Sequence, residues 1–387
     1  MSAMLPLHYA IRNLLRDPAR LMQTLFGTAL VVVLVMGAYA LNDGMYRSMQ
    51  VAGNPDNVLL LGAGSEESVQ RSEVGEQAAG IAEASIHGVY EVLGTRAVSP
   101  EIYHMAYLDV ADAGRMRGQI RGVTSRALLA HPGVSLIKGT FPGPKEVMVG
   151  RVAWRRLGVP EQALQPGKVV GFDGVSLTVS GIFAHPGAVT ESEVWMDLNQ
   201  LRTLAQRESV SAVVVRLGET GTPDDVDLFT KQRFDLELAA ISEGDYYAKL
   251  VAFYRPVRTM TWITALLIAV SAVFGGLNTL YAAFASRVRE IATLQALGFG
   301  RTAVVVSFIQ ESLIAALIGT GIGALACSLL LADRVVSLGA SAFRLSIEPE
   351  TLYAGLLAGA VLGLVGALPP AIRCLGPALP SALRDSA

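Results

Sequence analysis

The chain has 387 residues, of which 52% are hydrophobic and only 17% are charged, whereas charged residues make up about 25% of a typical soluble domain. The net charge is −2 and no dense cluster of Lys and Arg with interleaved aromatic residues occurs, which excludes a nucleic-acid-binding protein because neutralising phosphates requires a basic surface. Residues 43–256 carry 20 of the 31 basic and 26 of the 33 acidic residues, so the sequence predicts one polar domain within an apolar, membrane-embedded chain.

The first 20 residues have the pattern of an amphipathic helix. Four apolar residues share one helical face: Leu7, Ile11, Leu14 and Leu15. Three arginines occupy other positions: Arg12, Arg16 and Arg20. The pattern predicts that residues 1–20 form a cytoplasmic helix at the membrane interface, with its arginines at the membrane surface near anionic headgroups. A simple extension of the following apolar helix explains the pattern equally well.

Four segments are long and apolar enough to cross the hydrocarbon core, which takes roughly 20 helical residues. They are predicted at residues 21–41, 258–285, 302–332 and 351–372. A cleaved signal peptide is the alternative for the first segment. That segment is longer than the roughly 7–15 apolar residues of a signal-peptide core, so an uncleaved anchor is favoured.

The arginines of the short flanking segments indicate the orientation. Eight lie on one predicted side: Arg12, Arg16, Arg20, Arg287, Arg289, Arg301, Arg373 and Arg384. The short loop on the other side holds only Arg334 and Arg344. Because positive residues favour the cytoplasmic side, we expect the N-terminus, the loop 286–301 and the tail 373–387 in the cytoplasm. The domain 42–257 and the loop 333–350 are then extracytoplasmic.

The domain 42–257 alternates short Val-, Leu- and Ile-rich runs with helical patterns, such as those predicted at residues 76–93 and 224–241. This alternation is typical of an α+β domain, and its length predicts two subdomains. Both cysteines, Cys327 and Cys374, lie outside it, so it holds no disulfide. The predicted fold is therefore a membrane protein with four transmembrane α-helices and a large extracytoplasmic α+β domain inserted between helices 1 and 2.

No enzyme motif stands out in the sequence. Four histidines of the polar domain lack metal-ligand spacing: His87, His104, His131 and His185. The chain contains neither a G-x-S-x-G nucleophile elbow nor a G-x-x-x-x-G-K-[ST] phosphate-binding loop, the signatures of hydrolases and of many nucleotide-binding proteins. We therefore expect no catalytic residue, no metal and no cofactor in this chain. If ATP drives the protein, another subunit supplies the ATPase.

Small and polar residues stand out within the predicted spans. Five glycines are predicted to allow close helix packing: Gly319, Gly323, Gly355, Gly359 and Gly363. Glu311 is an intramembrane carboxylate, which costs about 2.5–3.5 kcal/mol when exposed at the centre of the bilayer. Two explanations for a carboxylate at this position remain open: it has a functional role, or it is structural and accepts a hydrogen bond from Ser307 or Ser312.

The segment 286–301 has the pattern of a short amphipathic helix. Ile291, Leu294 and Leu297 recur at helical spacing, and Gly298 is placed as a C-terminal stop. Three charged residues stand at its start: Arg287, Arg289 and Glu290. Such a helix suits a groove on a partner protein, whereas the plainer interpretation is a solvated charged turn.

The run Ser286-Arg-Val-Arg-Glu-Ile-Ala-Thr-Leu-Gln-Ala-Leu-Gly298 closely resembles the loop motif of FtsX-like permeases of the MacB/LolC type. These are the membrane subunits of the ABC systems called type VII or mechanotransmission transporters. The resemblance extends to Ala10-Ile-Arg-Asn-Leu14, to Glu146-Val-Met-Val-Gly150 and to the tail 370–384. Thr140-Phe141 stands where the family often has arginine.

The resemblance implies a permease dimer, either a homodimer or a pair of related subunits, bound to two cytoplasmic ABC ATPase subunits that hold ATP and Mg²⁺. It implies that seven residues contact the ATPase: Arg287, Arg289, Glu290, Ile291, Leu294, Leu297 and Gly298. Membrane lipids, a periplasmic adaptor and an outer-membrane channel are further candidate partners. The implied location is the bacterial inner membrane.

Three functional hypotheses remain open from the sequence. The first is a permease subunit that couples ATP hydrolysis to movement of the outer domain and exports or extracts an amphiphile, such as a lipid, a lipoprotein or a hydrophobic drug. The second is a signal transducer that activates a periplasmic cell-wall hydrolase without transport. The third is a sensor or scaffold with no ATPase. The large outer domain favours transport.

Overall fold

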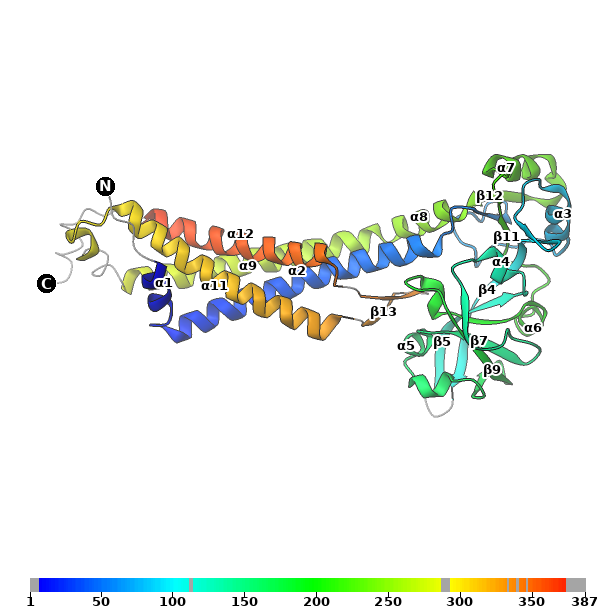
Figure 1. The fold of residues 1–387 in the computed structure, drawn as a ribbon, viewed down its shortest axis with the longest axis horizontal. Coiled ribbons are helices and arrows are strands. Elements are labelled where there is room, and N and C mark those ends of the chain that lie inside the picture. Colours follow the sequence, from blue (N-terminus) through cyan, green and yellow to red (C-terminus); the bar gives the residue numbers. More distant parts are fainter. Residues whose placement is uncertain are drawn as a thin grey trace. The chain divides into compact units, whose positions relative to one another are not determined.

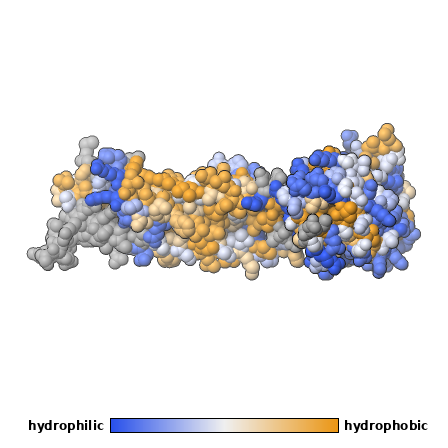
Figure 2. Space-filling view, turned by 90° about the horizontal axis from the view of Figure 1, so that it is seen from below, coloured by the Kyte–Doolittle hydropathy of each residue, from blue (hydrophilic) through white to orange (hydrophobic). Residues whose placement is uncertain are grey.

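The computed structural model describes residues 7–110, 114–286, 293–332, 334–338, 341–345 and 347–373. The chain divides into two compact units. The helical unit comprises residues 1–43, 256–334 and 345–387, and the β-rich unit comprises residues 44–255 and 335–344. Figure 1 shows long helices in the first and strands in the second. Hydrophobic residues cover the long helices, whereas hydrophilic residues predominate on the visible face of the β-rich unit (Figure 2).

Four helices are long and apolar enough to cross a membrane: α2 (Pro18–Ala52), α9 (Arg255–Ser286), α11 (Arg301–Leu331) and α12 (Pro349–Arg373). The four predicted segments lie within these helices, except that α11 ends one residue before the predicted end at residue 332. The helix α2 is much longer than the predicted segment 21–41, because it continues without a break to Ala52. Its residues from 44 onward belong to the β-rich unit.

The N-terminal helix α1 (Leu7–Leu14) is separate from α2. Pro18 opens α2, where its missing N–H costs nothing, and the Asp17 carboxylate accepts a hydrogen bond from the backbone N–H of Arg20 at 3.2 Å. This cap starts a new helix, so the alternative that α1 simply extends α2 is wrong. In addition, α1 packs against α11 and buries Ala10, Asn13 and Leu14.

The β-rich unit is built on one large sheet with the strand order β12-β1-β11-β4-β5-β10-β7-β9-β6. Its strands are β1 (Asn57–Gly62), β4 (Val98–Val110), β5 (Gly114–Val123), β6 (Ser135–Gly139), β7 (Glu146–Gly150), β9 (Val175–Ala184), β10 (Val194–Asp197), β11 (Ala212–Arg216) and β12 (Leu238–Ser242), and β8 (Val169–Phe172) pairs with β4 and β9. The long strand β4 pairs with β11 through its first residues and with β5 through the rest. It therefore belongs to both halves of the sheet.

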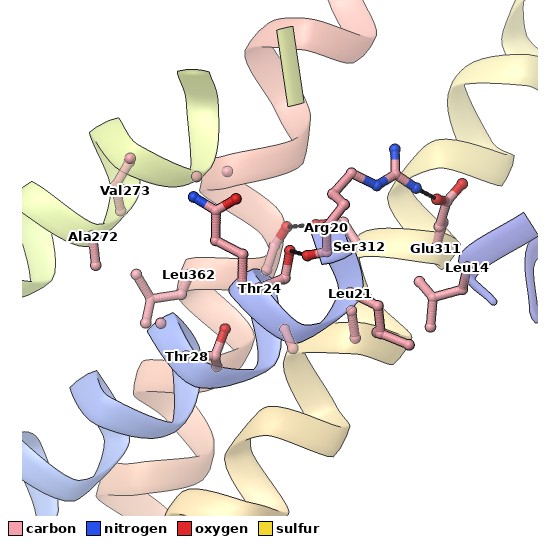
Figure 3. Close-up of a pocket in the computed structure, with 18 of the residues that line it drawn as sticks. Leu14, Arg20, Leu21, Thr24, Thr28, Ala272, Val273, Glu311, Ser312 and Leu362 are labelled. Atoms are coloured by element: carbon pink, nitrogen blue, oxygen red, sulfur yellow. Dashed lines mark hydrogen bonds and ion pairs between the residues drawn. The ribbon is translucent and has the colours of Figure 1, made fainter. Parts of the chain in front are cut away.

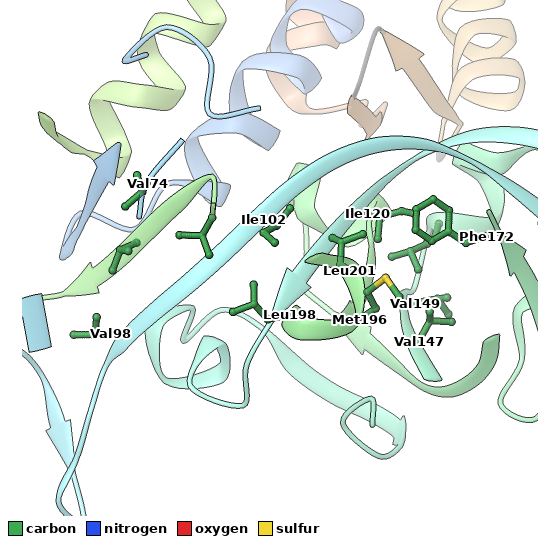
Figure 4. Packing of buried hydrophobic residues seen from close by; sticks show 14 of the residues in the cluster. Val74, Val98, Ile102, Ile120, Val147, Val149, Phe172, Met196, Leu198 and Leu201 are labelled. Carbon is green, nitrogen blue, oxygen red and sulfur yellow. The ribbon is translucent and has the colours of Figure 1, made fainter. Parts of the chain in front are cut away.

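Short helices and hairpins complete this unit. They are α3 (Gln77–Ser85), α4 (Ala127–Ala130), α5 (Ala153–Leu157), α6 (Leu198–Leu204), α7 (Pro223–Gln232) and α8 (Glu243–Phe253), with the hairpins β2 (Glu91–Val92)–β3 (Thr95–Arg96) and β13 (Val335–Leu338)–β14 (Ser341–Arg344). The main core lies between strands and helices; Figure 4 shows Ile102, Ile120 and Met196 within it beside Leu198 and Leu201 of α6.

Two helices predicted in this domain are too long. The helix predicted at 224–241 ends at Gln232, and residues 238–242 form β12, which pairs with β1. The helix predicted at 76–93 ends at Ser85, where Ile86 becomes extended, and Gly88, with a φ of +69°, then turns the chain toward β2. The fold class is nevertheless as predicted: four membrane-spanning helices with a large α+β domain inserted after the first.

Candidate functional site in the helical unit

A buried polar cluster surrounds Glu311 on α11. Its carboxylate forms an ion pair with Arg20 of α2 and accepts a hydrogen bond from the Asn13 side-chain amide of α1 at 2.8 Å. Figure 3 shows Arg20 reaching toward Glu311 from the first turn of α2. Three helices therefore meet at one carboxylate, and the ion pair compensates a charge that would be costly in an apolar environment.

One of the two serines expected to bind Glu311 bonds elsewhere. Ser312 donates its hydrogen bond to the Gly363 carbonyl of α12 at 3.1 Å, whereas the Arg20 and Asn13 side chains bind the carboxylate. Arg20 was predicted at the membrane surface; its side chain is instead only 10% exposed, because it turns toward Glu311. Arg12 and Arg16 are exposed, and their role at a membrane surface remains a prediction.

A cavity of about 220 Å³ lies beside this cluster, between α2, α9, α11 and α12. Figure 3 shows its labelled walls: Leu14, Arg20, Leu21, Thr24, Thr28, Ala272, Val273, Glu311, Ser312 and Leu362. Apolar side chains and glycines form most of the lining, and the Arg20–Glu311 pair supplies the charged part. A cavity with this division suits a molecule that has both an apolar and a polar part.

The five glycines singled out in the sequence lie at helix contacts. An added Cβ would stand 2.7 Å from the Ala29 carbonyl oxygen at Gly323 and 2.9 Å from the Thr28 Cβ at Gly319, both facing α2. On α12, Gly355 faces α2, whereas Gly359 and Gly363 face α11. The absence of side chains lets these three helices approach closely.

Only part of the predicted ATPase-binding segment lies in the described residues. Arg287, Arg289, Glu290 and Ile291 lie outside them. Residues 293–296 form a helical turn that ends at Gly298, whose φ of +93° favours glycine. The Phe299 N–H donates to the Leu294 carbonyl at 3.1 Å and closes the turn. Leu297 is 72% exposed, so an apolar side chain stands free of the chain's own core.

Within the described ranges, no group of three or more His, Cys, Asp and Glu residues is arranged to hold a metal ion. Sequence reasoning missed the roles of Asn13 and Arg20 at Glu311. The one sequence signal for these roles is Asp17-Pro18, which separates α1, carrying Asn13, from α2, carrying Arg20.

The comparisons with known proteins agree with this architecture. Residues 22–227 match the family model described as a MacB-like periplasmic core domain, and residues 262–377 match that of the FtsX-like permease C-terminal region. The chain is 25% identical over 236 residues to the "Macrolide export ATP-binding/permease protein MacB" of Hahella chejuensis (strain KCTC 2396). The match covers 56% of this chain and 32% of the relative, so it spans about a third of that protein's length.

Two solved structures also resemble the chain. One is the periplasmic region of MacB from Actinobacillus actinomycetemcomitans, with 10% identity and a TM-score of 0.39, covering 51% of this chain and 94% of that one. The other is the extracellular domain of the noncanonic ABC-type transporter YknZ from Gram-positive bacteria, with 14% identity and a TM-score of 0.37, covering 48% of this chain and 99% of that one.

Proposed function

This chain belongs to the FtsX-like permeases with a MacB-like periplasmic core domain, and from that membership we propose that it is the permease subunit of an ABC transporter whose ATP is hydrolysed by separate cytoplasmic subunits. The observation that carries the proposal is the segment 286–301. It has the family's loop motif, and it presents the exposed Leu297 beside a glycine-terminated turn.

The proposed coupling follows the continuity of two helices. The segment 286–301 follows α9 directly, and only Tyr254 separates α9 from α8 of the β-rich unit. Likewise, α2 runs without interruption from Pro18 to Ala52. Because hydrogen-bonded helices resist bending, a displacement of the cytoplasmic segment is passed to the β-rich unit through these two connections. The arginine distribution supports a cytoplasmic location for the segment and for both termini.

The proposed substrate is an amphiphile, such as a lipid, a lipoprotein or a hydrophobic drug. The cavity beside Glu311 supports this class, because it combines apolar walls with one charged pair. The proposed assembly contains two permease chains, identical or related, and two ATPase subunits in a bacterial inner membrane.

Substitution Leu297→Asp tests the proposed contact. An aspartate cannot enter an apolar groove without desolvation, so the affinity for the ATPase should fall at least about 30-fold, equivalent to about 2 kcal/mol at an interface hot spot. Affinity-tagged full-length chain is purified from its native membranes, and the co-purified ATPase is identified by mass spectrometry. Its affinity for the wild-type and variant chains is then titrated in lipid nanodiscs.

Gln295→Asp is the matched control, because it introduces the same charge in the same turn at a residue that is not among the seven implied ATPase contacts. It should retain the ATPase. Wild-type chain that recovers no ATP-hydrolysing protein, or equal binding by the Leu297→Asp variant, would contradict the proposal.

A further inference from the structure

A cluster of charged residues, here the charge cluster, lies inside the β-rich unit. Its five members come from five different segments and are all at least nine-tenths buried: Glu101, Arg121, His131, Glu193 and Glu243. Burying this many ionisable groups is costly unless they are paired. Their contacts show what the cluster holds together.

Arg121 of β5 forms the centre of the charge cluster. Its Nε and Nη2 donate to the two carboxylate oxygens of Glu193 at 2.7 and 2.8 Å. Its Nη1 donates to Glu101 of β4 at 3.0 Å, and the guanidinium lies over the Tyr103 ring. Two carboxylates and one guanidinium therefore link neighbouring strands by bidentate and charge-assisted hydrogen bonds.

His131, which follows α4, extends the cluster to a third carboxylate. Its Nε2 lies 2.8 Å from Glu101 Oε1, and its Nδ1 lies 3.9 Å from Glu243 Oε1. The imidazole thus stands between a carboxylate of the sheet and a carboxylate of α8. When protonated, it bears the one positive charge that faces Glu243 directly among these five residues.

Glu243 lies in the first turn of α8 and joins this helix to the end of α2. Its Oε2 accepts hydrogen bonds from the Asn57 amide at 2.8 Å and from the Asn54 backbone N–H at 3.1 Å. At Gly53, immediately after α2, an added Cβ would stand 3.1 Å from Tyr247 and 3.3 Å from the Glu243 carbonyl oxygen. Both chain segments that enter the β-rich unit from α2 and α9 therefore meet at Glu243.

Two residues of the charge cluster, His131 and Glu243, have raised pKa values and therefore hold a proton to higher pH than usual. Burial lowers the pKa of His131, but Glu101 and Glu243 outweigh burial and raise the pKa above its usual value. Burial raises the pKa of Glu243, and the attraction of His131 only partly offsets this effect. Although burial disfavours its charge, Glu101 has a pKa of about 2, lowered by His131 and Arg121.

Three further titratable groups near the charge cluster are uncharged near neutral pH: His185, Tyr103 and Tyr247. Burial, with the charges of His131 and Arg121, lowers the pKa of His185 to about 4. Burial raises the pKa of Tyr103 and of Tyr247 well above 10. Among these groups, His131 is therefore the one that loses its positive charge as the pH rises above the ordinary histidine pKa.

We propose that protonated His131, whose Nδ1 lies 3.9 Å from the Glu243 carboxylate, latches α8 to the sheet by its positive charge, and that this joint within the β-rich unit loosens as the pH rises. The role of this latch in coupling rests on the proposed function. Only Tyr254 separates α8 from α9, so a loosened α8 transmits less displacement from α9 to the sheet. When the proton leaves, Glu243 and Glu101 face a neutral imidazole in a buried site, and repulsion between the carboxylates favours release of α8.

The direction follows from linkage. A raised His131 pKa stabilises the joint fully below the ordinary histidine pKa, and this stabilisation is lost as the pH rises through the pKa in the closed joint. The raised Glu243 pKa acts in the same direction. Over that interval the opening constant of α8 should rise by up to about tenfold per pH unit, since one proton is released on opening.

Hydrogen–deuterium exchange of the full-length chain in nanodiscs, without ATP or partners, measures this opening. We expect protection of residues 243–253, corrected for the intrinsic exchange rate, to fall about tenfold between pH 6 and 9. His131→Gln should abolish this pH dependence and leave α8 weakly protected throughout. Glu243→Gln keeps the hydrogen-bond acceptor but removes the charge, so it should give a protected α8 with a flat profile.

His104→Gln is the matched control, because His104 lies on the same strand as Glu101 outside the cluster and should leave the wild-type profile unchanged. A flat wild-type profile, or a step that persists in Glu243→Gln, would overturn the latch. Should His131→Gln fail to fold, Glu243→Gln alone decides. The exchange measurement uses no ATPase, so its outcome is independent of the proposed ATPase contact. A negative exchange result would overturn only the latch, and failure to recover an ATPase would overturn only the proposed function.

Discussion

Substitution Arg20→Met is expected to destabilise the helical unit by about 3 kcal/mol or more. It removes the guanidinium that pairs with the buried Glu311 carboxylate, and breaking a buried ion pair by removing one partner typically costs about 3–5 kcal/mol. The double variant Arg20→Met/Glu311→Leu removes both charges and should recover most of this loss. Thermal unfolding of the detergent-solubilised chain measures the three stabilities.

Arg12→Met is the matched control, because Arg12 is an exposed arginine of the same N-terminal segment. It should unfold like the wild type. Equal stability of Arg20→Met and Arg12→Met would contradict the assigned ion pair. If the double variant is stable but inactive, the pair serves transport, whereas a stable and active double variant assigns it a structural role.

Substitution Gly323→Val is expected to separate α11 from α2 and to destabilise the chain by about 1–3 kcal/mol, the usual cost of overpacking. The new Cβ would stand 2.7 Å from the Ala29 carbonyl oxygen and 3.0 Å from the Val32 Cβ. Because backbone atoms cannot turn aside as a long side chain does, the helices must move. Loss of ordered packing should appear as a lower unfolding temperature.

Gly321→Val provides the comparison on the same helix. Gly321 is exposed, and an added Cβ there meets no atom within 4 Å. This variant should unfold close to the wild-type temperature. Equal destabilisation by the two substitutions would show that valine disturbs α11 itself rather than its contact with α2.

The membrane helices could be predicted from sequence because a long apolar run has few alternatives. The length of α2 could not, since Asn42, Asp43 and Arg47 end the apolar run without ending the helix. Likewise, hydrophobicity does not show that α2 begins at Pro18. That start depends on the hydrogen bond from the Arg20 backbone N–H to the Asp17 carboxylate.

The β-rich unit was harder to predict because several of its strands bury charge. β4 carries Glu101 and β5 carries Arg121, and both side chains are fully buried. In sequence they resemble surface positions, since burial of such residues depends on partners distant in the chain. β12 was mistaken for the end of a helix because the segment after Gln232 lacks a clear alternating pattern.

The candidate sites show the same division. The sequence singled out Glu311 from its charge alone, but its partners depend on how α1 and α2 meet α11. His131 was treated as an ordinary histidine, and no local motif links it to Glu101 and Glu243, which lie 30 residues before it and over 100 after it. The segment 286–301 was identified by its motif, and its contact with an ATPase remains a prediction.

The most direct test of the proposed coupling is the distance between the β-rich units of the two permease chains during ATP turnover. Spin labels at Lys168→Cys, an exposed position, report this distance in nanodiscs after Cys327 and Cys374 are replaced by alanine. The account predicts that the distance changes when ATP is added to the complex with the ATPase, and that Leu297→Asp abolishes the change. An unchanged distance while the wild-type complex hydrolyses ATP would contradict it.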